Sequence, residues 1–387
     1  MPRVYAPTPF RWTDGIDYPF GYFDMPDDSK ARAMKSGNKV FDSPGDAAGA
    51  AALQTLVSGP GIFLTIPALS AELGKAASAG LGCISFSGDS TSGGTGASDP
   101  DVYGPAACLG RVLQGRGVPL AGTGMVGQYR ESANSSQWTG AGWSDFGRTS
   151  NLMQGTAVRT FTSKSVGTVA SVLYGKTGGN FNVSIDGGAN TLVTCDGSAA
   201  FGTYTVTGLA NATHTITIAP VAAASHIYAA EVRAATGLRI HNFGVGGAIS
   251  SECTSTANWF TTLNAVIASG SKVHFLRCGI NDPGVSVPLA TTVANIMAGC
   301  AFLKANGVLP VILTQNPYQN NDATVTAMAA AIVSAALAAG YAVFDSTTRV
   351  FKDYPTANAL GLQTNPIHPN DAGYSAEAVK LCNALLA

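Results

Sequence analysis

The chain has 387 residues, of which 46% are hydrophobic and 12% charged, so it can bury a sizeable core and is not a disordered polypeptide. Lys and Arg number 22 against 23 Asp and Glu, which gives a net charge of -1. Without a basic cluster there is no surface to neutralise phosphates, and we expect no nucleic-acid partner.

Residues 1–76 are predicted to form an extended arm followed by packing helices. Pro, Tyr, Phe and Trp are frequent in the first part, and the Ala-rich stretch 47–56 favours a helix. The start MPRVYAPTPFRWTDGIDY has no apolar h-region, so no signal peptide is predicted, and the sequence leaves the compartment unknown.

Residues 77–125 are predicted to begin an α/β domain. The apolar run GCISF at 82–86 indicates a buried strand, and the segment 102–117 indicates the helix after it. Between them lies FSGDSTSGG, residues 86–94. Ser, Asp and Gly are common turn residues, so taken alone this stretch fits a plain turn as well as a loop that carries a nucleophile.

Residues 126–235 have a different pattern. Segments such as TVASVLYG, FNVSID and HTITIAP are short and rich in Val, Thr, Ile and Tyr, and turn pairs such as Gly178-Gly179 and Asp196-Gly197 separate them. This spacing predicts an antiparallel β-sandwich or jelly roll. We expect it to be a separate inserted domain whose two ends leave and re-enter the α/β domain close together.

Residues 236–387 alternate between strand-length and helix-length apolar runs. Strands are expected at 238–243, 273–277, 308–314 and 341–345, and helices at 258–269, 291–306, 322–339 and within 371–386. The alternation predicts an α/β fold with a parallel sheet covered by helices on both faces. The uncharged run 325–344 fits a buried helix and strand better than a membrane span, so no membrane partner is expected.

Several polar residues stand where predicted strands become loops. His368, in the proline-punctuated loop TNPIHPNDAGY, is the candidate general base, whereas the other four histidines lie within or at the end of strands. Gly247 could present its N–H, and Asn281 its amide, to an oxyanion. Singly, each also fits a cap or a turn. The seven cysteines show no C-x-x-C and no Cys/His ligand spacing, so no metal or cofactor is expected.

Four motifs in order resemble the SGNH/GDSL hydrolase family, whose blocks are G-D-S, N-x-G-x-x-G, G-x-N-D and D-x-x-H. Here they stand as Gly88-Asp89-Ser90, Asn242-Phe243-Gly244-Val245-Gly246-Gly247, Gly279-Ile280-Asn281-Asp282 and Asn365-Pro366-Ile367-His368. The resemblance covers about 77–125 and 236–387. It implies a flavodoxin-like three-layer α/β/α fold and metal-free ester hydrolysis. Ser90 would be the nucleophile, His368 its base, and Ser90 N–H, Gly247 N–H and Asn281 the oxyanion hole.

The sequence departs from the family at Asn365, where the fourth block normally has Asp. An amide oxygen can orient the His368 ring, but it cannot offset the charge of the imidazolium that forms as Ser90 attacks. A backbone carbonyl or another carboxylate could take over, or the enzyme could run as a Ser-His dyad, or it could be weak. Asp371 is near in sequence but lies three residues beyond the histidine.

The expected substrate follows from the inserted region, which resembles the carbohydrate-binding-type modules found beside some SGNH esterases. Trp138 and Trp143, with Tyr129, could stack on sugars, and Tyr318 could line the cleft; packing roles fit each equally well. This implies a carbohydrate O-acetylesterase acting on an acetylated polysaccharide or glycan. Family members with such inserts also occur on phage tails, which suggests homo-oligomerisation or virion attachment through the arm. The alternatives are a lipase or thioesterase, and a glycan-binding or structural tail protein whose Asn365 records lost activity.

Overall fold

The computed structural model describes residues 67–127, 137–146, 151–319, 321–363 and 365–385, and five short strands between residues 3 and 41. Residues Phe63–Lys380 make one compact unit, and Met1–Ile62 with Leu381–Ala387 the other. In the second of these, β1 (Arg3–Ala6) pairs with β4 (Gly21–Asp24) and β5 (Lys39–Phe41), and β2 (Phe10–Arg11) pairs with β3 (Asp17–Tyr18). The helix expected at 47–56 lies outside the described residues.

Five parallel strands form the centre of the larger unit. They are β6 (Leu81–Gly88), β18 (Gly237–Gly244), β19 (Val273–Arg277), β20 (Leu309–Leu313) and β21 (Ala342–Phe344). Their order is β18-β6-β19-β20-β21, the 2-1-3-4-5 arrangement of flavodoxin-like sheets. The predicted parallel sheet is confirmed. The order changes direction at β6, so the loop after β6 lies at the switch point where such folds bind ligands.

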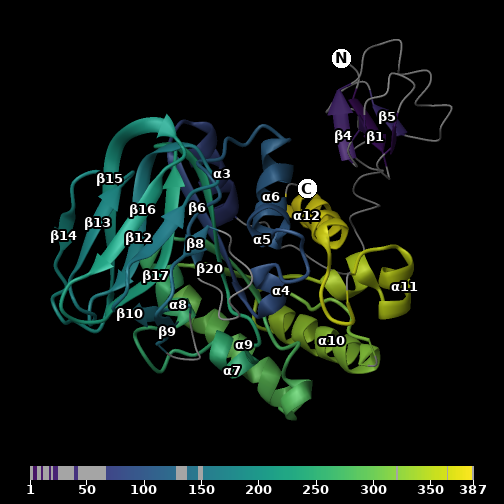
Figure 1. Ribbon diagram of the computed structural model, residues 1–387. Helices are drawn as coiled ribbons and strands as arrows, with labels where there is room; N and C mark the ends of the chain where they lie inside the picture. The colour runs from purple at the N-terminus through teal and green to yellow at the C-terminus, as the bar shows by residue number, and fades with distance from the viewer. Residues whose placement is uncertain are drawn as a thin grey trace. The chain divides into compact units, whose positions relative to one another are not determined.

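Helices cover both faces of these strands (Figure 1). On one face Leu276, Ile312 and Val343 pack against Ile296 and Ile332 in a shared apolar cluster. The next side chain along β19 points to the opposite face, where Arg277 meets Glu377. The helices are α3 (Pro67–Ala77), α5 (Pro100–Tyr103), α6 (Pro105–Gln114), α7 (Ser250–Cys253), α8 (Thr262–Ala268), α9 (Leu289–Ala305), α10 (Asp322–Ala338), α11 (Tyr354–Ala359) and α12 (Asp371–Leu385).

One of the predicted helices is divided in the structure. The single helix expected at 102–117 is divided at Gly104, because the residue before Pro105 is pushed out of the helical region and is extended here, with φ of -68° and ψ of 168°. The uncharged run 325–344 forms the greater part of α10 followed by β21. Among the helices that the structure describes, none combines the length and the apolar character needed to cross a membrane.

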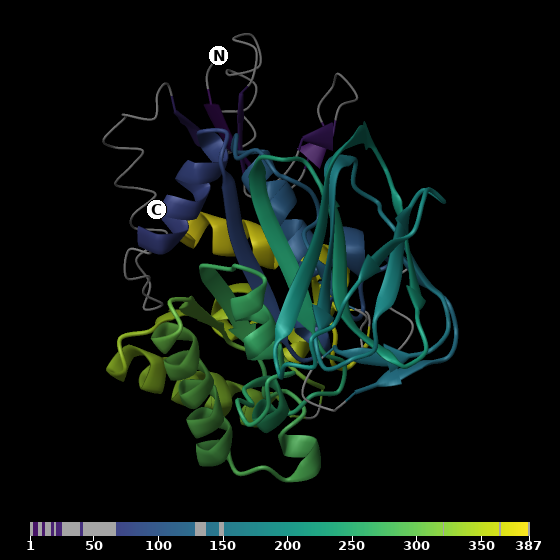
Figure 2. The same cartoon turned by 90° about the vertical axis from the view of Figure 1, so that its left-hand side faces the viewer.

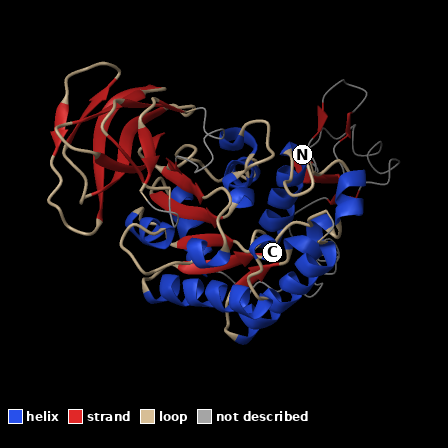
Figure 3. Cartoon of the chain, turned by 60° about the horizontal axis from the view of Figure 1, so that its bottom comes forward, coloured by secondary structure: helices blue, strands red, loops and turns tan. Residues whose placement is uncertain are grey.

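The inserted region is an antiparallel sandwich of two facing sheets. Phe161, Phe181, Ile216 and Ile218 from one sheet meet Val172 and Val232 from the other in a common core. Figure 3 shows the insertion as a group of strands beside the helix-covered part of the molecule. The strands are β7 (Val126–Gly127), β8 (Trp138–Thr139), β9 (Trp143–Asp145), β10 (Met153–Gly155), β11 (Arg159–Thr162), β12 (Gly167–Gly175), β13 (Phe181–Ile185), β14 (Thr191–Val193), β15 (Phe201–Ala212), β16 (Thr215–Pro220) and β17 (Ser225–Arg233).

The expectation that the insertion is a separate domain is wrong. Strand β7 pairs antiparallel with β17 and parallel with β18, so the sheet β15-β12-β17 continues into the parallel strands and the whole has 11 strands. Figure 2 shows the teal strands of the insertion beside the parallel strands. A two-residue strand has no readable periodicity, so the sequence could not reveal this junction.

The predicted boundary at residue 76 also shifts. Helix α3 belongs to the same compact unit as β6, and its Glu72 carboxylate accepts a 2.8 Å hydrogen bond from the Cys83 N–H. The packing helix of the predicted arm is therefore part of the α/β layer arrangement.

Candidate active site

The predicted nucleophile lies directly after β6, at the first position of the short helix α4 (Ser90–Gly93). Asp89 caps this helix and accepts from Thr91 N–H at 2.9 Å and from the Thr91 hydroxyl at 2.7 Å. Burial raises the pKa of Asp89 to about 6, against the effect of these hydrogen bonds. Gly88 is required here: its φ is +139°, and a Cβ would lie 1.5 Å from the Arg277 carbonyl oxygen.

Ser90 and His368 meet although 278 positions separate them in the sequence. The Ser90 Oγ lies 2.9 Å from His368 Nε2, and Nδ1 of the same ring lies 3.2 Å from Asn365 Oδ1. Burial lowers the pKa of His368 from its ordinary value, which keeps the ring neutral at neutral pH. With Nδ1–H donating to Asn365, Nε2 is free to accept the serine proton.

Asn365 occupies the place that the family gives to aspartate. Besides the ring nitrogen, its Oδ1 accepts from the backbone N–H of Ile367 and of His368, each at 2.9 Å. Asp371 binds elsewhere: its carboxylate accepts from Ser98 N–H at 2.7 Å and from the Ser98 hydroxyl at 2.6 Å. Across the described ranges, no carboxylate hydrogen bonds to the His368 ring, so the arrangement is Ser-His-Asn.

Three donors are available for an oxyanion. The Ser90 and Gly247 backbone N–H groups donate to no residue that the structure describes. Asn281 Nδ2 donates to the Ala248 carbonyl at 2.9 Å, and its second hydrogen remains available. Asn242 joins the first two motifs, because its Nδ2 donates to the Gly93 carbonyl at 3.2 Å.

Sequence reasoning missed the role of Asp282, the last residue of the third motif. Its buried carboxylate accepts from Ser250 N–H at 2.8 Å, from the Ser250 hydroxyl at 2.5 Å and from the Thr292 hydroxyl at 2.6 Å. These bonds join the Asn281 loop to the start of α7, just beyond Gly247. The signal available in the sequence was only that a carboxylate follows Asn281 directly.

Sequence analysis also missed that the loop after β20 supports the histidine. Asn316 Nδ2 donates to the Ile367 carbonyl, and Gln319 N–H donates to the Pro366 carbonyl at 2.8 Å. Tyr318 lies between them and is half-buried. The amide-rich stretch QNPYQNN was the readable signal, because Asn and Gln side chains can bind backbone groups of a neighbouring loop.

The tryptophans of the insertion do not both fit sugar stacking. Trp138 is 8% exposed, and its indole N–H donates to the Val126 carbonyl while its ring packs 5.1 Å from that of Phe161. Pairing with β11 turns Trp138 into the sandwich core, so its predicted role in substrate binding is wrong. Trp143 is half-buried and donates to the Ala157 carbonyl at 3.0 Å, and its role stays a prediction. Tyr129 lies outside the described residues.

Two histidines of the sheet have structural surroundings. His274 lies between the hydroxyls of Ser85 and Ser87, at 2.8 and 2.7 Å, and burial lowers its pKa to about 3. His241 accepts from Met125 N–H at 2.7 Å. Ser92, the other serine of the nucleophile turn, donates to the Arg277 carbonyl at 3.2 Å. Ser87 and Ser92 therefore act as structural residues, and Ser90 is the serine of this turn that contacts His368.

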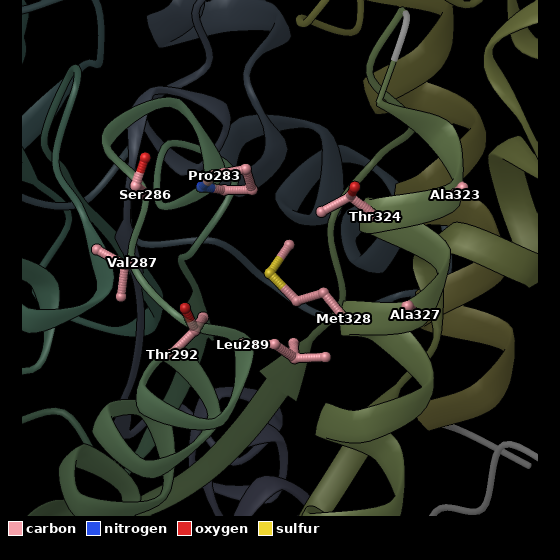
Figure 4. Close-up of a pocket in the computed structure, with 9 residues that line it drawn as sticks. All are labelled: Pro283, Ser286, Val287, Leu289, Thr292, Ala323, Thr324, Ala327 and Met328. Carbon is pink, nitrogen blue, oxygen red and sulfur yellow. The ribbon is translucent and has the colours of Figure 1, made fainter.

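A cavity of about 490 Å³ lies beside the Asn281 loop, between the 3-10 turn η1 (Pro283–Val285), the start of α9 and the first turns of α10 (Figure 4). Thr292, whose hydroxyl donates to Asp282, forms part of its wall. Most of the lining is apolar: Pro283, Val287, Leu289, Ala323, Ala327 and Met328, with Ser286, Thr292 and Thr324.

Part of the chain matches a known protein family. Residues 205–376 match the model of the GDSL-like lipase/acylhydrolase family, a range that contains Gly247, Asn281 and His368 but begins after Ser90. No curated protein sequence matches the chain. The fold and the matched motifs define a carboxylic ester hydrolase. This part of the chain is similar to the GDSL-like lipase/acylhydrolase family, the SGNH hydrolases.

The chain is similar to several solved structures, and the first of those described here shares its fold. A peptidoglycan O-acetylesterase is 14% identical, with a TM-score of 0.63 over 83% of this chain and 95% of that chain. A putative lipolytic G-D-S-L protein from Desulfitobacterium hafniense is 20% identical, with a TM-score of 0.34 over 38% and 82% of the two chains. A family two carbohydrate esterase from Cellvibrio japonicus is 10% identical, with a TM-score of 0.28 over 63% and 93%.

Replacing Asn281 by alanine is expected to lower kcat by about 10²- to 10³-fold, the usual cost of one oxyanion donor. Its amide is placed by the Ala248 carbonyl, so the loss removes a positioned N–H and not a flexible one. Steady-state kinetics on p-nitrophenyl acetate measure this. A change in KM alone would instead make Asn281 a substrate contact.

Proposed function

We propose that the protein removes O-acetyl groups from a polysaccharide or glycan with Ser90 as nucleophile. The observation that carries the proposal is the 2.9 Å contact between Ser90 Oγ and His368 Nε2, with Nδ1 of the same ring held by Asn365. This is the geometry that a serine nucleophile and its base require.

The reaction follows from these positions. Ser90 Oγ bonds to the acetyl carbon while its proton moves to His368 Nε2, and the carbonyl oxygen becomes an oxyanion held by the Ser90 and Gly247 N–H groups and Asn281. Collapse breaks the bond to the sugar oxygen, which leaves with the proton from His368. Water then attacks the acetyl-Ser90 ester through the same base, releasing acetate and restoring the serine.

Two observations support a glycan as the alcohol part. The peptidoglycan O-acetylesterase shares the fold over 83% of this chain, a share too large to leave out the insertion. The leaving alcohol must lie on the His368 side, because His368 protonates it. Tyr318 belongs to the loop that is hydrogen bonded to the residues just before His368, and it can pack against a sugar ring there.

Tyr318→Ala is therefore expected to lower kcat/KM for O-acetylated peptidoglycan or polysaccharide by about tenfold, the loss of one aromatic contact of about 1.4 kcal/mol. Its kcat/KM for p-nitrophenyl acetate, which has no sugar, should be unchanged. Acetate release measures the first rate and absorbance the second. Equal losses on both substrates would contradict the sugar contact, and absence of acetate release by the parent protein would contradict the proposed function.

One observation favours the lipase or thioesterase alternative, namely the apolar cavity of about 490 Å³ beside the Asn281 loop. A series of p-nitrophenyl esters of increasing acyl length separates the two functions. If acetyl esters are the substrates, kcat/KM should fall as the acyl chain becomes longer. Ala327→Trp, which fills the cavity, should leave the hydrolysis of acetyl esters unchanged. Faster turnover of long-chain esters by the parent protein, abolished in Ala327→Trp, would favour the lipase or thioesterase alternative. A role of the arm in virion attachment stays a prediction.

A further inference from the structure

One side chain of the insertion reaches the loop that carries Gly247. Asn151 lies just before β10 and is 1% exposed, and its Nδ2 donates a 2.8 Å hydrogen bond to the Gly244 carbonyl. Gly244 is the last residue of β18, three positions before Gly247. The insertion thus contacts the second motif of the catalytic domain directly, in addition to sharing its sheet.

The bond to Asn151 is one of two that hold the same peptide group. The Gly244 carbonyl accepts from Asn151, and the N–H of the same group, on Val245, donates to the Gly88 carbonyl at 2.8 Å. A peptide group is planar, so bonds at its two opposite edges determine the orientation of that plane. Gly88 lies two residues before Ser90. The pair of bonds therefore sets the loop that leads to Gly247 against the strand that leads to the nucleophile.

Gly244, where the loop to Gly247 begins, packs closely against α4. A Cβ on Gly244 would lie 2.1 Å from the Gly93 nitrogen, so the start of the loop is pressed against α4. Any change in the orientation of the Gly244 carbonyl must move the residues after it, because the residues before it belong to β18.

Asn151 is itself anchored within the insertion. Its backbone lies beside the Tyr228 hydroxyl on β17, and its side chain packs on β7, where a Cβ on Gly127 would lie 2.8 Å from Asn151 Nδ2. Tyr228 is fully buried and donates to Thr262 on α8 at 3.3 Å. The position of the Asn151 amide is therefore set by strands of the insertion.

Burial of the Asn151 side-chain amide carries an energetic cost. In the part of the chain that the structure describes, the buried Oδ1 of Asn151 has no hydrogen-bond partner. A buried unpaired acceptor is unfavourable, and an apolar residue of the same size would avoid it. The Nδ2 donor is the group that a substitution of this kind would lose.

We propose that the insertion completes the catalytic centre, with Asn151 as a positioning residue that holds the Gly247 N–H in the oxyanion hole. The inference rests on the proposed function, because it takes Gly247 as an oxyanion donor. It assigns the insertion a part in catalysis that a separate sugar-binding module would not have.

The test is Asn151→Leu, which keeps the branched shape and the number of side-chain heavy atoms and removes the donor. We expect kcat to fall about 10- to 100-fold, less than or similar to the loss of a whole oxyanion donor, with KM changed by less than about twofold. Asn151→Asp should be at least as slow, because it turns a carboxylate oxygen toward the Gly244 carbonyl.

The matched control is Asn180→Leu, in the same insertion. Asn180 Oδ1 accepts from Cys195 N–H at 2.8 Å, and Asn180 has no hydrogen bond to the four motifs. This variant should lose thermal stability but keep the kcat of the parent. A kcat loss in Asn180→Leu equal to that in Asn151→Leu would overturn the proposal, because the effect would then follow stability alone.

A second readout isolates the oxyanion hole. An alkylboronic acid adds to Ser90 as a tetrahedral anion, so its inhibition constant in Asn151→Leu should rise by the same factor as kcat falls. The two losses from Asn151→Leu and Asn281→Ala should combine to less than their product, since both act on one oxyanion hole. Parent-like boronate inhibition, or full multiplicativity of the two losses, would overturn the positioning role.

The positioning role of Asn151 can be tested independently of esterase activity. Hydrogen exchange of the backbone amides at 244–248 needs no substrate, and it should be faster in Asn151→Leu than in Asn180→Leu. Unchanged exchange at 244–248 would overturn the positioning role even in an active enzyme. Faster exchange in a protein without esterase activity would support the structural contact and refute the proposed function instead.

Discussion

Ser90→Ala is expected to lower kcat for ester hydrolysis by about 10⁴-fold or more, because it removes the hydroxyl that contacts His368 and would form the acyl bond. Ser90 is 5% exposed and its Oγ lies 2.9 Å from His368 Nε2, so the variant removes the attacking oxygen without opening the core. His368→Ala should cost a similar factor. Rates on p-nitrophenyl acetate, with circular dichroism to check folding, measure both.

The matched control for this prediction is Ser92→Ala, in the same turn. Ser92 Oγ donates to the Arg277 carbonyl and has no contact with the histidine ring, so most of the activity should remain. If Ser90→Ala or His368→Ala kept most of the parent rate while folded, the assignment of the nucleophile and base would be wrong.

Asn365→Asp is expected to raise kcat. The amide oxygen already accepts from the His368 ring and from two backbone N–H groups, so a carboxylate would keep these bonds and add the charge that offsets the imidazolium. The gain has an upper limit of about 10⁴-fold, the size of the reverse effect in the serine-protease triad. Asn365 is exposed, so the new carboxylate is not forced into an apolar environment.

The pH dependence of kcat follows from the pKa of His368. His368 must be neutral to accept the serine proton, and burial lowers its pKa, so the parent should stay active below the ordinary histidine pKa of about 6.5. A carboxylate at 365 would raise the pKa of His368, and the acid limb of the rate profile would move to higher pH. The gain in kcat should therefore be largest at the alkaline end of the profile.

Measuring kcat for the parent and Asn365→Asp across pH 5 to 9 tests both statements. Asn365→Ala is the control, and it should be slower than the parent because the ring then loses its hydrogen-bond acceptor. An unchanged or lower kcat in Asn365→Asp at every pH would show that a Ser-His dyad already suffices.

The sequence by itself was enough to predict the parallel sheet, the four motifs in order and the location of the histidine loop. Apolar runs such as 273–277 report burial directly, and β19 has those bounds. Glycine and polar residues at strand ends mark loops in the same local way. These features depend on neighbours in the chain, so no tertiary structure is needed to find them.

Only the tertiary structure decided how these parts join. Strand β7 attaches the insertion to β18, Trp138 turns into the sandwich core, and Asp371 binds Ser98 rather than the histidine. The contacts of Asp282 with Ser250 and of Asn151 with Gly244 join segments 32 and 93 positions apart. Periodicity shows that a side chain is buried, but not which distant segment it meets. A hydrogen bond between two loops is set by the packing of the elements that carry them, and neither segment records its partner.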